Sequence, residues 1–247
     1  MDKAIYIAMA AGKNIMQAQA IHANNLANVN TSGFQTDFVQ ARSFSSQPSG
    51  SHDTRAYSLA ESTGTNFSRG PIIETGGELD MAIDGDGWIA VQAPDGTEAF
   101  TRYGAMKINA VGQLVTGNNL PVLGNGGPIA LPPFDNITLG SDGTITIQPE
   151  GQQANVLSVV DRVKLVNPNY EDLAKGLDGL VRRVDGQGEE PDASIRLQAG
   201  FIESSNVDAI SEMTNIMALA RDFEVSVKMM RTVEENSSAL AQVLRSQ

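Results

Sequence analysis

Cysteine is absent from the 247 residues, and histidine occurs only twice, as His22 and His52. Without cysteine the chain can form no disulfide, no thiolate metal site and no cysteine nucleophile. Neither histidine has a second nitrogen or sulfur ligand close by in the sequence, so we expect no metal site and no cofactor. The lack of cysteine suits a protein that crosses a membrane unfolded and works in an oxidising compartment.

Long apolar runs and positive charge are also scarce. No apolar stretch reaches the roughly 18 residues that a transmembrane helix needs. The N-terminus departs from the pattern of a cleaved signal peptide, because Asp2 precedes the apolar run and Gly12-Lys13-Asn14 interrupts it. If the protein is exported, we expect it to leave without a Sec-type signal. The net charge of −12 makes nucleic acid and anionic lipid poor partners.

The acidity is concentrated in the middle of the chain. Residues 1–33 carry one acid and two bases, a net charge of +1. Residues 201–247 carry seven acids and four bases, a net charge of −3, which leaves −10 for the residues between. The two ends of the chain are therefore close to neutral, and this favours contacts between them.

Each end of the chain has the apolar spacing of a helix. Residues 3–29 contain no proline and repeat small or apolar residues every three or four positions. The second helix is predicted from Ser205, with Asp208 completing a start like a capping box, to Leu244. At 1.5 Å per residue it would be about 58 Å long, too long for the interior of a domain this size. We therefore predict that the two terminal helices pair as a coiled coil.

Between the helices the apolar spacing changes to two, with frequent turn sequences. Ile195, Leu197 and Ala199 alternate with polar residues, and turns such as "SDGT" and "DGQG" recur. This pattern predicts an antiparallel all-β head. The fold class is therefore α+β. We predict a helical stem from residues 1–34 together with 203–247, an extended linker or arm over 35–75, and a head over 76–202.

The sequence gives little support to an active site. Asp84 and Asp86 lie in "DGDG", which fails the spacing of a calcium-binding EF-hand loop because Trp88 occupies the next ligand position, so a tight turn is favoured. "GNGGP" lacks the glycine spacing of a phosphate-binding loop, and no G-x-S-x-G motif occurs. We expect no enzyme and no small-molecule substrate. The alternative from another class is a secreted carbohydrate-active β-sandwich enzyme that uses Asp84, Asp86 or Glu98.

The stretch "HANNLANVNTSGF" at residues 22–34 ends the first helix with four asparagines and no full charge. A buried asparagine in a coiled coil costs stability but fixes register, because its amide needs a matched partner. Amide groups that cap a fraying helix end are the alternative explanation. A positive φ is expected at Gly33.

The same stretch resembles the N-terminal signature of the bacterial flagellar axial protein family, the rod and hook subunits. Three more blocks resemble that family: "SRGPIIETGGELDMAIDGDGWIAVQ", "FTRYGAMKINAVGQLVTGNNLPVLGNGGPIALP" and "ESSNVDAISEMTNIMALARDFEVSVKMMRTVEEN". Together the four blocks cover over half of the chain, in order. Within the family the details are most similar to proximal-rod subunits, and a distal-rod or hook subunit is the nearest alternative.

The resemblance implies a structural subunit of the flagellar basal-body rod, part of the drive shaft that transmits torque across the periplasm. It implies polymerisation through the terminal helices, with further copies and with other proximal and distal rod proteins as partners. It also implies export through the flagellar type III apparatus without a cleaved signal, and growth under a rod cap. The assembly residues that it indicates are Asn24, Asn25, Leu26, Asn28, Gly33, Phe34, Ser205, Asn206, Val207, Ile216, Arg221, Phe223, Val227 and Met230.

Overall fold

The structure is a computed structural model that describes residues 3–45, 56–152 and 156–245. The chain forms two compact units, described here one at a time. The helical unit comprises Met1–Val29, Thr36–Asn66 and Val207–Gln247, and the β unit comprises Asn30–Gln35 and Phe67–Asn206. Neither unit is continuous in sequence, because the chain passes between them four times.

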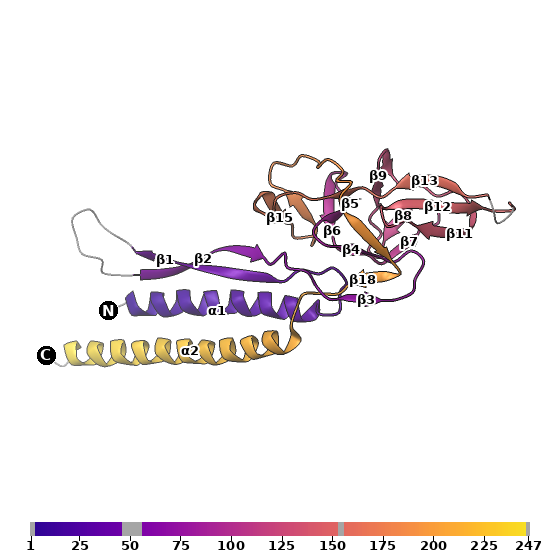
Figure 1. The fold of residues 1–247 in the computed structure, drawn as a ribbon. Helices are drawn as coiled ribbons and strands as arrows, with labels where there is room; N and C mark the ends of the chain where they lie inside the picture. The colour runs from indigo at the N-terminus through magenta and orange to yellow at the C-terminus, as the bar shows by residue number, and fades with distance from the viewer. Residues whose placement is uncertain (1–2, 46–55, 153–155, 246–247) are drawn as a thin grey trace. The chain divides into compact units, whose positions relative to one another are not determined.

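The helical unit contains the two long helices and one pair of strands. α1 (Lys3–Ala27) contacts α2 (Ala209–Arg245) along its length and also contacts the antiparallel strands β1 (Asp37–Ser45) and β2 (Ala56–Thr65) (Figure 1). The helices run antiparallel, since Gly12 lies beside Phe223 while His22, later on α1, contacts Glu212, earlier on α2. Neither helix, in the described part of the chain, is long and apolar enough to cross a membrane.

α2 packs on α1 through one row of side chains with the spacing of a coiled coil. Buried and half-buried residues recur at alternating intervals of three and four, the repeat that keeps one seam facing a partner helix. Two of the eight residues in this row are polar and nevertheless buried. The seam consists of Ala209, Glu212, Ile216, Leu219, Phe223, Ser226, Met230 and Val233.

The helix ends differ by a few residues from those predicted. α2 begins at Ala209 rather than at Ser205, because the Asp208 carboxylate accepts a hydrogen bond from the Ile210 N–H at 3.0 Å and caps the helix. α1 ends at Ala27. Gly33 has the predicted positive φ, +64°, but it lies beyond the helix end.

Paired strands occupy much of the stretch that was predicted to be an extended linker. β1 and β2 pair from Asp37 opposite Thr65 to Ser45 opposite Ala56, with an irregularity between Gln40 and Ala41. The prediction rested on the serine, proline and glycine content of the stretch, and residues 46–55 at its centre lie outside the described residues. Pairing of the two strands satisfies their backbone hydrogen bonds. It therefore needs no apolar pattern in the sequence that would indicate a strand.

The β unit is built from short antiparallel strands. One sheet has the order β14-β5-β6-β16-β15, a second has the order β11-β12-β13, and the remaining strands form two-stranded ribbons (Figure 1). The strands are β3 (Ile72–Glu74), β4 (Met81–Asp84), β5 (Trp88–Gln92), β6 (Glu98–Thr101), β7 (Met106–Ile108), β8 (Leu114–Thr116), β9 (Leu123–Gly124), β10 (Gly127–Pro128), β11 (Phe134–Leu139), β12 (Thr144–Pro149), β13 (Ser158–Arg162), β14 (Leu165–Val166), β15 (Leu173–Lys175), β16 (Val181–Arg183), β17 (Arg196–Ala199) and β18 (Phe201–Glu203), and a 3-10 turn covers Tyr170–Asp172.

Of the alternating residues named in the sequence, Ile195 and Leu197 lie in the core of the β unit, whereas Ala199 is exposed. Met81, Ile83, Ile89 and Val91 are almost fully buried, and so is Leu197. The predicted strand through residues 195–201 is interrupted at Gly200, whose φ is +81°, so that β17 pairs with β4 and β18 with β3. The α+β class, with paired terminal helices and an antiparallel β region, is confirmed.

Candidate functional site

Asn25 joins three elements of the helical unit. Its side chain is fully buried, and its amide group forms two hydrogen bonds with the backbone of Asp37, which begins β1. Asn25 Nδ2 donates to the Asp37 carbonyl at 2.8 Å, and Asn25 Oδ1 accepts from the Asp37 N–H at 3.1 Å. The same Nδ2 also donates to the Glu212 carboxylate on α2 at 3.3 Å.

Glu212 places a carboxylate on the seam of α2, where an apolar residue would be expected. The side chain is 7% exposed and bonds both Asn25 and the imidazole Nδ1 of His22, one turn earlier on α1. Burial of a carboxylate costs free energy unless polar partners bond to it. A slip of α1 by one turn would separate Glu212 from both partners, so this cluster fixes the register of the two helices.

The other asparagines of the motif finish α1. The Asn28 side chain donates to the Asn24 carbonyl at 2.9 Å, and the Asn28 N–H donates to the carbonyls of Asn24 and Asn25 at 3.2 and 3.0 Å. These carbonyls belong to the last turn, which has no further helical partner. Leu26 is half-buried beside them. Both explanations of the motif therefore apply, with Asn25 joining elements and Asn28 capping the helix.

The end of the motif belongs to the β unit. The Gly33 N–H donates to the Glu203 carbonyl at 2.8 Å, and the Asn206 N–H donates to the Phe34 carbonyl at 3.2 Å. The ammonium group of Lys175 lies 4.2 Å from the centre of the Phe34 ring, which is a cation–π contact. Residues 30–35 thus form a strap against the segment that ends the β unit.

Glycine is the only residue type that fits at position 33 of this strap. Its φ of +64° is a conformation that other residues rarely adopt. A Cβ atom there would also lie 2.3 Å from the carbonyl carbon of Arg102. Both the backbone conformation and the close approach exclude a side chain.

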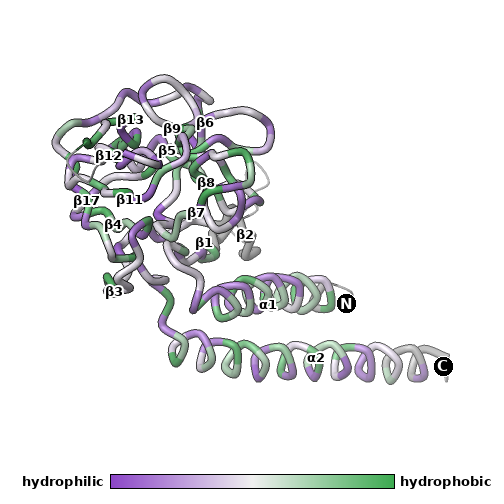
Figure 2. Tube along the Cα trace, turned by 90° about the vertical axis from the view of Figure 1, so that its right-hand side faces the viewer, coloured by the Kyte–Doolittle hydropathy of each residue, from purple (hydrophilic) through white to green (hydrophobic). Residues whose placement is uncertain are grey.

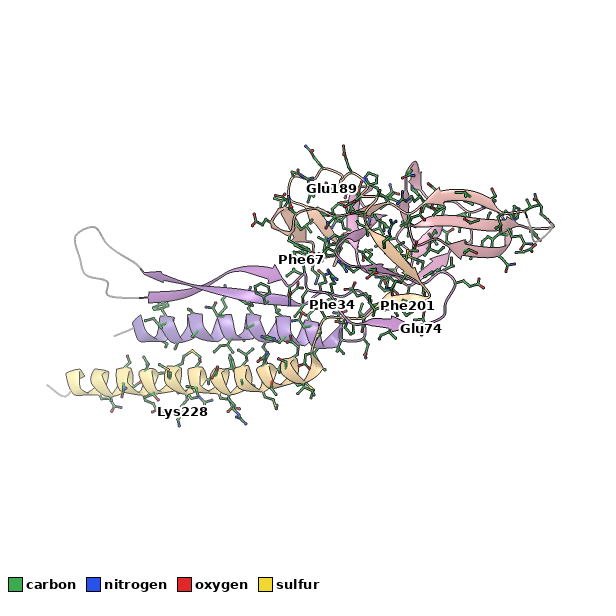
Figure 3. All side chains as sticks on the ribbon, in the orientation of Figure 1. Phe34, Phe67, Glu74, Glu189, Phe201 and Lys228 are labelled. Carbon is green, nitrogen blue, oxygen red and sulfur yellow. The ribbon has the colours of Figure 1, made fainter. Side chains whose placement is uncertain are left out.

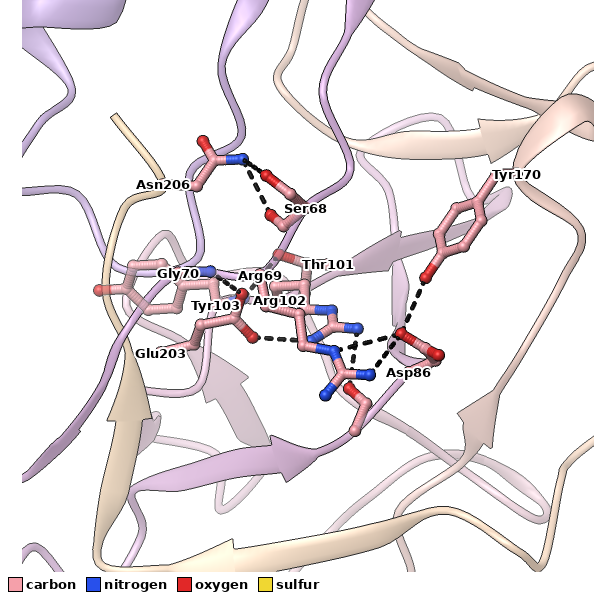
Figure 4. A network of polar contacts seen from close by, with 11 residues as sticks. Ser68, Arg69, Gly70, Asp86, Thr101, Arg102, Tyr103, Tyr170, Glu203 and Asn206 are labelled. Carbon is pink, nitrogen blue, oxygen red and sulfur yellow. Dashed lines mark hydrogen bonds and ion pairs between the residues drawn. The ribbon is translucent and has the colours of Figure 1, made fainter. Parts of the chain in front are cut away.

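A buried ion pair lies next to the strap (Figure 4). Arg102 and Glu203 are 1% and 3% exposed, and Arg102 Nη1 donates to Glu203 Oε2 at 2.8 Å. The other Glu203 oxygen accepts from the Gly70 N–H at 2.9 Å, and Arg102 Nη2 donates to the Gly85 carbonyl at 3.1 Å. The guanidinium also lies 5.5 Å from the centre of the Trp88 ring. The pair therefore connects the segment before β3, β18 and the β4–β5 turn.

The three acids considered for a carbohydrate-active enzyme form ion pairs or lie on the surface. They are Asp84, Asp86 and Glu98. Asp86 accepts from Arg69 at 2.8 Å and from the Tyr170 hydroxyl at 3.2 Å, and the Arg69 hydrogen bonds hold the pKa of Asp86 below its usual range. Glu98 accepts from Lys164 Nζ at 2.8 Å. Asp84 is exposed at the end of β4.

The predicted residues near the start of α2 divide between the units. Ser205 is buried, and Asn206 donates its side-chain amide to the Ser68 carbonyl at 2.9 Å, both within the β unit. Val207 is the first residue of the returning helical unit and is half-buried. These residues lie where the chain leaves the β unit.

The predicted residues on α2 itself follow the seam closely. Ile216, Phe223 and Met230 are seam residues that face α1, and Val227 is half-buried beside them. Arg221 is exposed, one step off the row that was predicted to form the seam. The positions of these side chains are those expected for a helix pair.

A second set of apolar residues on the helices was missed. Side chains project from both helices away from their shared seam (Figure 3), and hydrophobic and hydrophilic segments alternate along them (Figure 2). The longest apolar row of each helix dominates the sequence pattern, and the shorter rows beside it give a weaker signal. The large apolar residues exposed here are Tyr6, Ile7, Met9 and Met16 on α1, and Ile210, Met213, Met217, Val225 and Met229 on α2.

α2 also extends past the start of α1. Because Gly12 lies beside Phe223, antiparallel packing places Lys3 beside a residue near 232, so about 13 residues or roughly 20 Å of α2 have no α1 alongside. A polar helix without packing partners is only marginally stable in water. Among the described residues, the helical unit therefore has both an exposed apolar surface and a helix end that extends past α1.

Three family models match the chain. One describes the flagella basal body rod protein and covers residues 5–35, and one describes the D1 domain of the flagellar hook protein FlgE/F/G and covers residues 82–151. The third describes the C-terminal part of the flagellar basal body rod FlgEFG protein and covers residues 198–243. The matched residues include α1, much of the β unit and most of α2.

Known rod proteins match over the whole chain. The flagellar basal-body rod protein FlgF of Escherichia coli is 36% identical, and that of Salmonella typhimurium is 37% identical, each over 99% of both chains. The FlgG rod protein of Bacillus subtilis is 30% identical over 99% of this chain and 100% of its own. This is a family of structural rather than catalytic proteins. The chain belongs to the flagellar basal-body rod protein family.

Proposed function

We propose that this chain is a subunit of the proximal part of the flagellar rod, and that it polymerises through the outer surfaces of its terminal helices. The observation that carries the proposal is the exposed apolar surface of a helix pair whose own seam is already filled. Exposed apolar area of this kind is a mark of protein–protein contact. Head-to-tail contacts that do not close on themselves would build a helical tube.

Membership of the rod family supports a proposal about the partners. We propose further copies of this chain and other rod subunits, proximal and distal, as neighbours. A position in the rod across the periplasm, export by the flagellar type III apparatus without a cleaved signal, and growth under a rod cap belong to the same proposal. The identity to the FlgF proteins of Escherichia coli and Salmonella typhimurium, 36% and 37% against 30% for the FlgG protein of Bacillus subtilis, supports the proximal position over the distal-rod or hook alternative.

The proposed assembly residues have two kinds of role. Seam and junction residues set the shape of the helical unit, and exposed residues contact neighbours. Arg221 is charged and exposed, and we propose that its guanidinium pairs with an acid of a neighbouring subunit. The first group is Asn25, Leu26, Asn28, Gly33, Phe34, Ser205, Asn206, Val207, Ile216, Phe223, Val227 and Met230, and the second is Asn24 and Arg221, to which the exposed apolar residues are added.

Phe223→Asp is the direct test. A carboxylate on the seam would separate α1 from α2, so the variant should be absent from purified hook–basal bodies while its β unit stays folded and resistant to protease. Val111→Asp is the matched control, since Val111 is an exposed apolar residue of the β unit and belongs to neither helix. Normal incorporation of the Phe223→Asp protein would refute the role of the seam.

The position along the rod needs a separate measurement. Antibody labelling of hook–basal bodies, with mass spectrometry to identify the chain, should place it near the membrane end of the rod. Labelling further out would replace the proposal by the distal-rod or hook alternative. Absence from intact basal bodies would overturn the rod function itself.

A further inference from the structure

Asn125 and Gly126 are the only asparagine–glycine pair in the sequence. They form the two-residue turn between β9 and β10, whose strands pair Gly124 with Gly127. Both turn residues are exposed. In such a pair the backbone nitrogen of the glycine can approach the side-chain amide carbon of the asparagine, because glycine has no Cβ atom to obstruct it. The turn therefore holds a nucleophile and an electrophile side by side.

The structure leaves both reacting groups of this turn free. Within the described part of the chain, neither the Asn125 side-chain amide nor the Gly126 N–H forms a hydrogen bond. A Cβ atom placed on Gly126 would meet nothing within 4 Å, so the space around the turn is open. Gly126 does not have a positive φ, so its backbone conformation is one that other residues adopt as well.

Two other asparagines of the β unit lack one of these features. Asn118 is exposed, but the residue after it is Asn119, which carries a side chain. The Asn109 amide is held in place, since its Oδ1 accepts from the Val111 N–H at 3.0 Å and from the Gln113 N–H at 2.9 Å. Of Asn109, Asn118 and Asn125, only the last combines exposure, a free amide and a following glycine.

The aspartate–glycine pairs of the β unit are less reactive for a chemical reason. Ring closure at aspartate requires a protonated carboxyl group, because an oxide ion is a poor leaving group. Hydrogen bonds from the hydroxyl and N–H groups of Thr97 and Thr144 hold the pKa of Asp95 and Asp142 below their usual range. These carboxyl groups are ionised at neutral pH, whereas the Asn125 amide is neutral and has ammonia as its leaving group.

We propose that Asn125 is a site of spontaneous deamidation. The Gly126 nitrogen loses its proton and bonds to the Asn125 Cγ, the Cγ–Nδ2 bond breaks, and Nδ2 leaves as ammonia. Water then opens the five-membered imide ring at either carbonyl, which gives aspartate or isoaspartate. One water molecule is consumed and one ammonia molecule is released. Because both groups lie in one turn, the attack is intramolecular and needs no enzyme. The proposal does not depend on the proposed rod function.

The product adds a negative charge where acids are already present. The Asn125 N–H donates to Asp161 Oδ1 at 3.4 Å, and Asn125 lines a cavity of about 140 Å³ whose charged residues are Arg162 and Asp192. An aspartate at position 125 therefore adds like-charge repulsion to a place with two acids and one base. Isoaspartate also adds one backbone atom to the turn, and this disturbs the pairing of β9 with β10. The altered fraction rises with the age of the chain.

Peptide mapping by mass spectrometry tests the site in the folded, full-length chain. The purified protein is kept at mildly alkaline pH and physiological temperature, and is sampled over several weeks. The peptide with Asn125 should gain one mass unit and become a substrate for an isoaspartyl methyltransferase, about tenfold or more faster than peptides with Asn109 or Asn118. Equal rates at all of these asparagines would overturn the proposal. Aspartate without any isoaspartate would overturn the ring mechanism.

Two substitutions separate the sequence pair from its geometry. Gly126→Ala fits the open turn, and its Cβ should slow the reaction of Asn125 about tenfold or more. Asn119→Gly creates a second asparagine–glycine pair, at a φ of +63° that glycine adopts readily. The N–H of residue 119 donates to the Thr116 carbonyl at 2.9 Å, so Asn118 in this variant should react more slowly than Asn125. An unchanged rate in Gly126→Ala would overturn the proposal, and equal rates in Asn119→Gly would overturn the role of the open turn.

Thermal unfolding measures what the modification does to the β unit. A wild-type sample that mass spectrometry shows to be largely deamidated should unfold at a lower temperature than a fresh sample. Gly126→Ala kept for the same time is the matched control and should unfold like its own fresh sample. Identical unfolding of the deamidated and fresh wild-type samples would overturn the expected effect on the β9–β10 turn.

Discussion

The side-chain amide of Asn25 binds both backbone polar groups of Asp37, donating to its carbonyl at 2.8 Å and accepting from its N–H at 3.1 Å. An amide side chain is here doing what a neighbouring strand would do for Asp37, while it also reaches Glu212 on α2. One residue thereby connects α1, β1 and α2.

Asn25→Ala should destabilise the helical unit by about 2–4 kcal/mol, because Asp37 loses two backbone hydrogen bonds and the buried Glu212 carboxylate loses one of its two partners. The measurement is urea unfolding of the free chain, followed by circular dichroism in the far ultraviolet. Asn24→Ala is the control, since Asn24 is exposed, and should change stability by less than about 0.5 kcal/mol. Equal effects of the two variants would contradict this role of Asn25.

Gly33→Ala should lower the stability of the β unit more than Gly76→Ala does. Both glycines have a positive φ, +64° and +68°, so both variants bear the left-handed strain of about 1–2 kcal/mol. Only at Gly33 does the new Cβ overlap backbone, at 2.3 Å from Arg102, whereas nothing lies within 4 Å at Gly76. Thermal unfolding of the two variants should therefore differ by several degrees. Similar melting temperatures would mean that the strap moves freely.

Removal of one partner of the buried Arg102–Glu203 pair should lower the stability of the β unit far more than loss of the exposed Arg69–Asp86 pair. Arg102→Met leaves the Glu203 carboxylate buried and without its cation, with an expected loss of about 3–5 kcal/mol in the stability of the β unit. Arg69→Ala breaks the Arg69–Asp86 pair, whose side chains are about half exposed, and should cost less than about 1 kcal/mol. The double variant Arg102→Met with Glu203→Leu should be more stable than Arg102→Met alone, and a further loss would contradict the explanation.

The Asp178–Arg182 pair should give a measurable pH effect. Hydrogen bonds from Arg182 at 3.0 and 2.6 Å lower the pKa of Asp178 in the folded chain. A carboxyl group with a lowered folded pKa stabilises the fold above its unfolded pKa, and this contribution is lost as pH falls through the folded pKa. In Arg182→Ala the pKa of Asp178, followed by NMR titration, should move up toward its ordinary value. Arg183→Ala should leave the pKa of Asp178 unchanged. A shift of that pKa in Arg183→Ala would mean that its lowering does not depend on Arg182 alone.

The helices could be predicted because their signal is local. Ile216, Phe223 and Met230 repeat at intervals of seven, and that repeat alone predicts a seam. Glu212 and Ser226 occupy the same seam, but their polarity removes them from any apolar pattern. The burial of Glu212 depends on His22, 190 residues away, which no local pattern reveals. The Ser226 hydroxyl donates to the Asp222 carbonyl one turn earlier.

The parts that were missed depend on long-range pairing. The strand pair β1–β2 carries no strong apolar alternation, so the serine-rich segment suggested a linker. The Arg102–Glu203 pair joins residues 101 positions apart, and each would look like a surface charge in the sequence. The turn at "DGDG" was predicted correctly, with positive φ at Gly85 and Gly87, because turn chemistry is local.

The strap also bears on the order in which the chain folds. His22 and Glu212 are 190 residues apart, and a free chain would lose much entropy in bringing them together. Once the β unit has formed, the hydrogen bond from Gly33 to Glu203 shortens the effective loop between them to about 20 residues. Loop-closure entropy then favours the meeting of α1 and α2 by roughly 2 kcal/mol more than before. We therefore expect the β unit to form before the two terminal helices pair, because the pairing then costs less entropy.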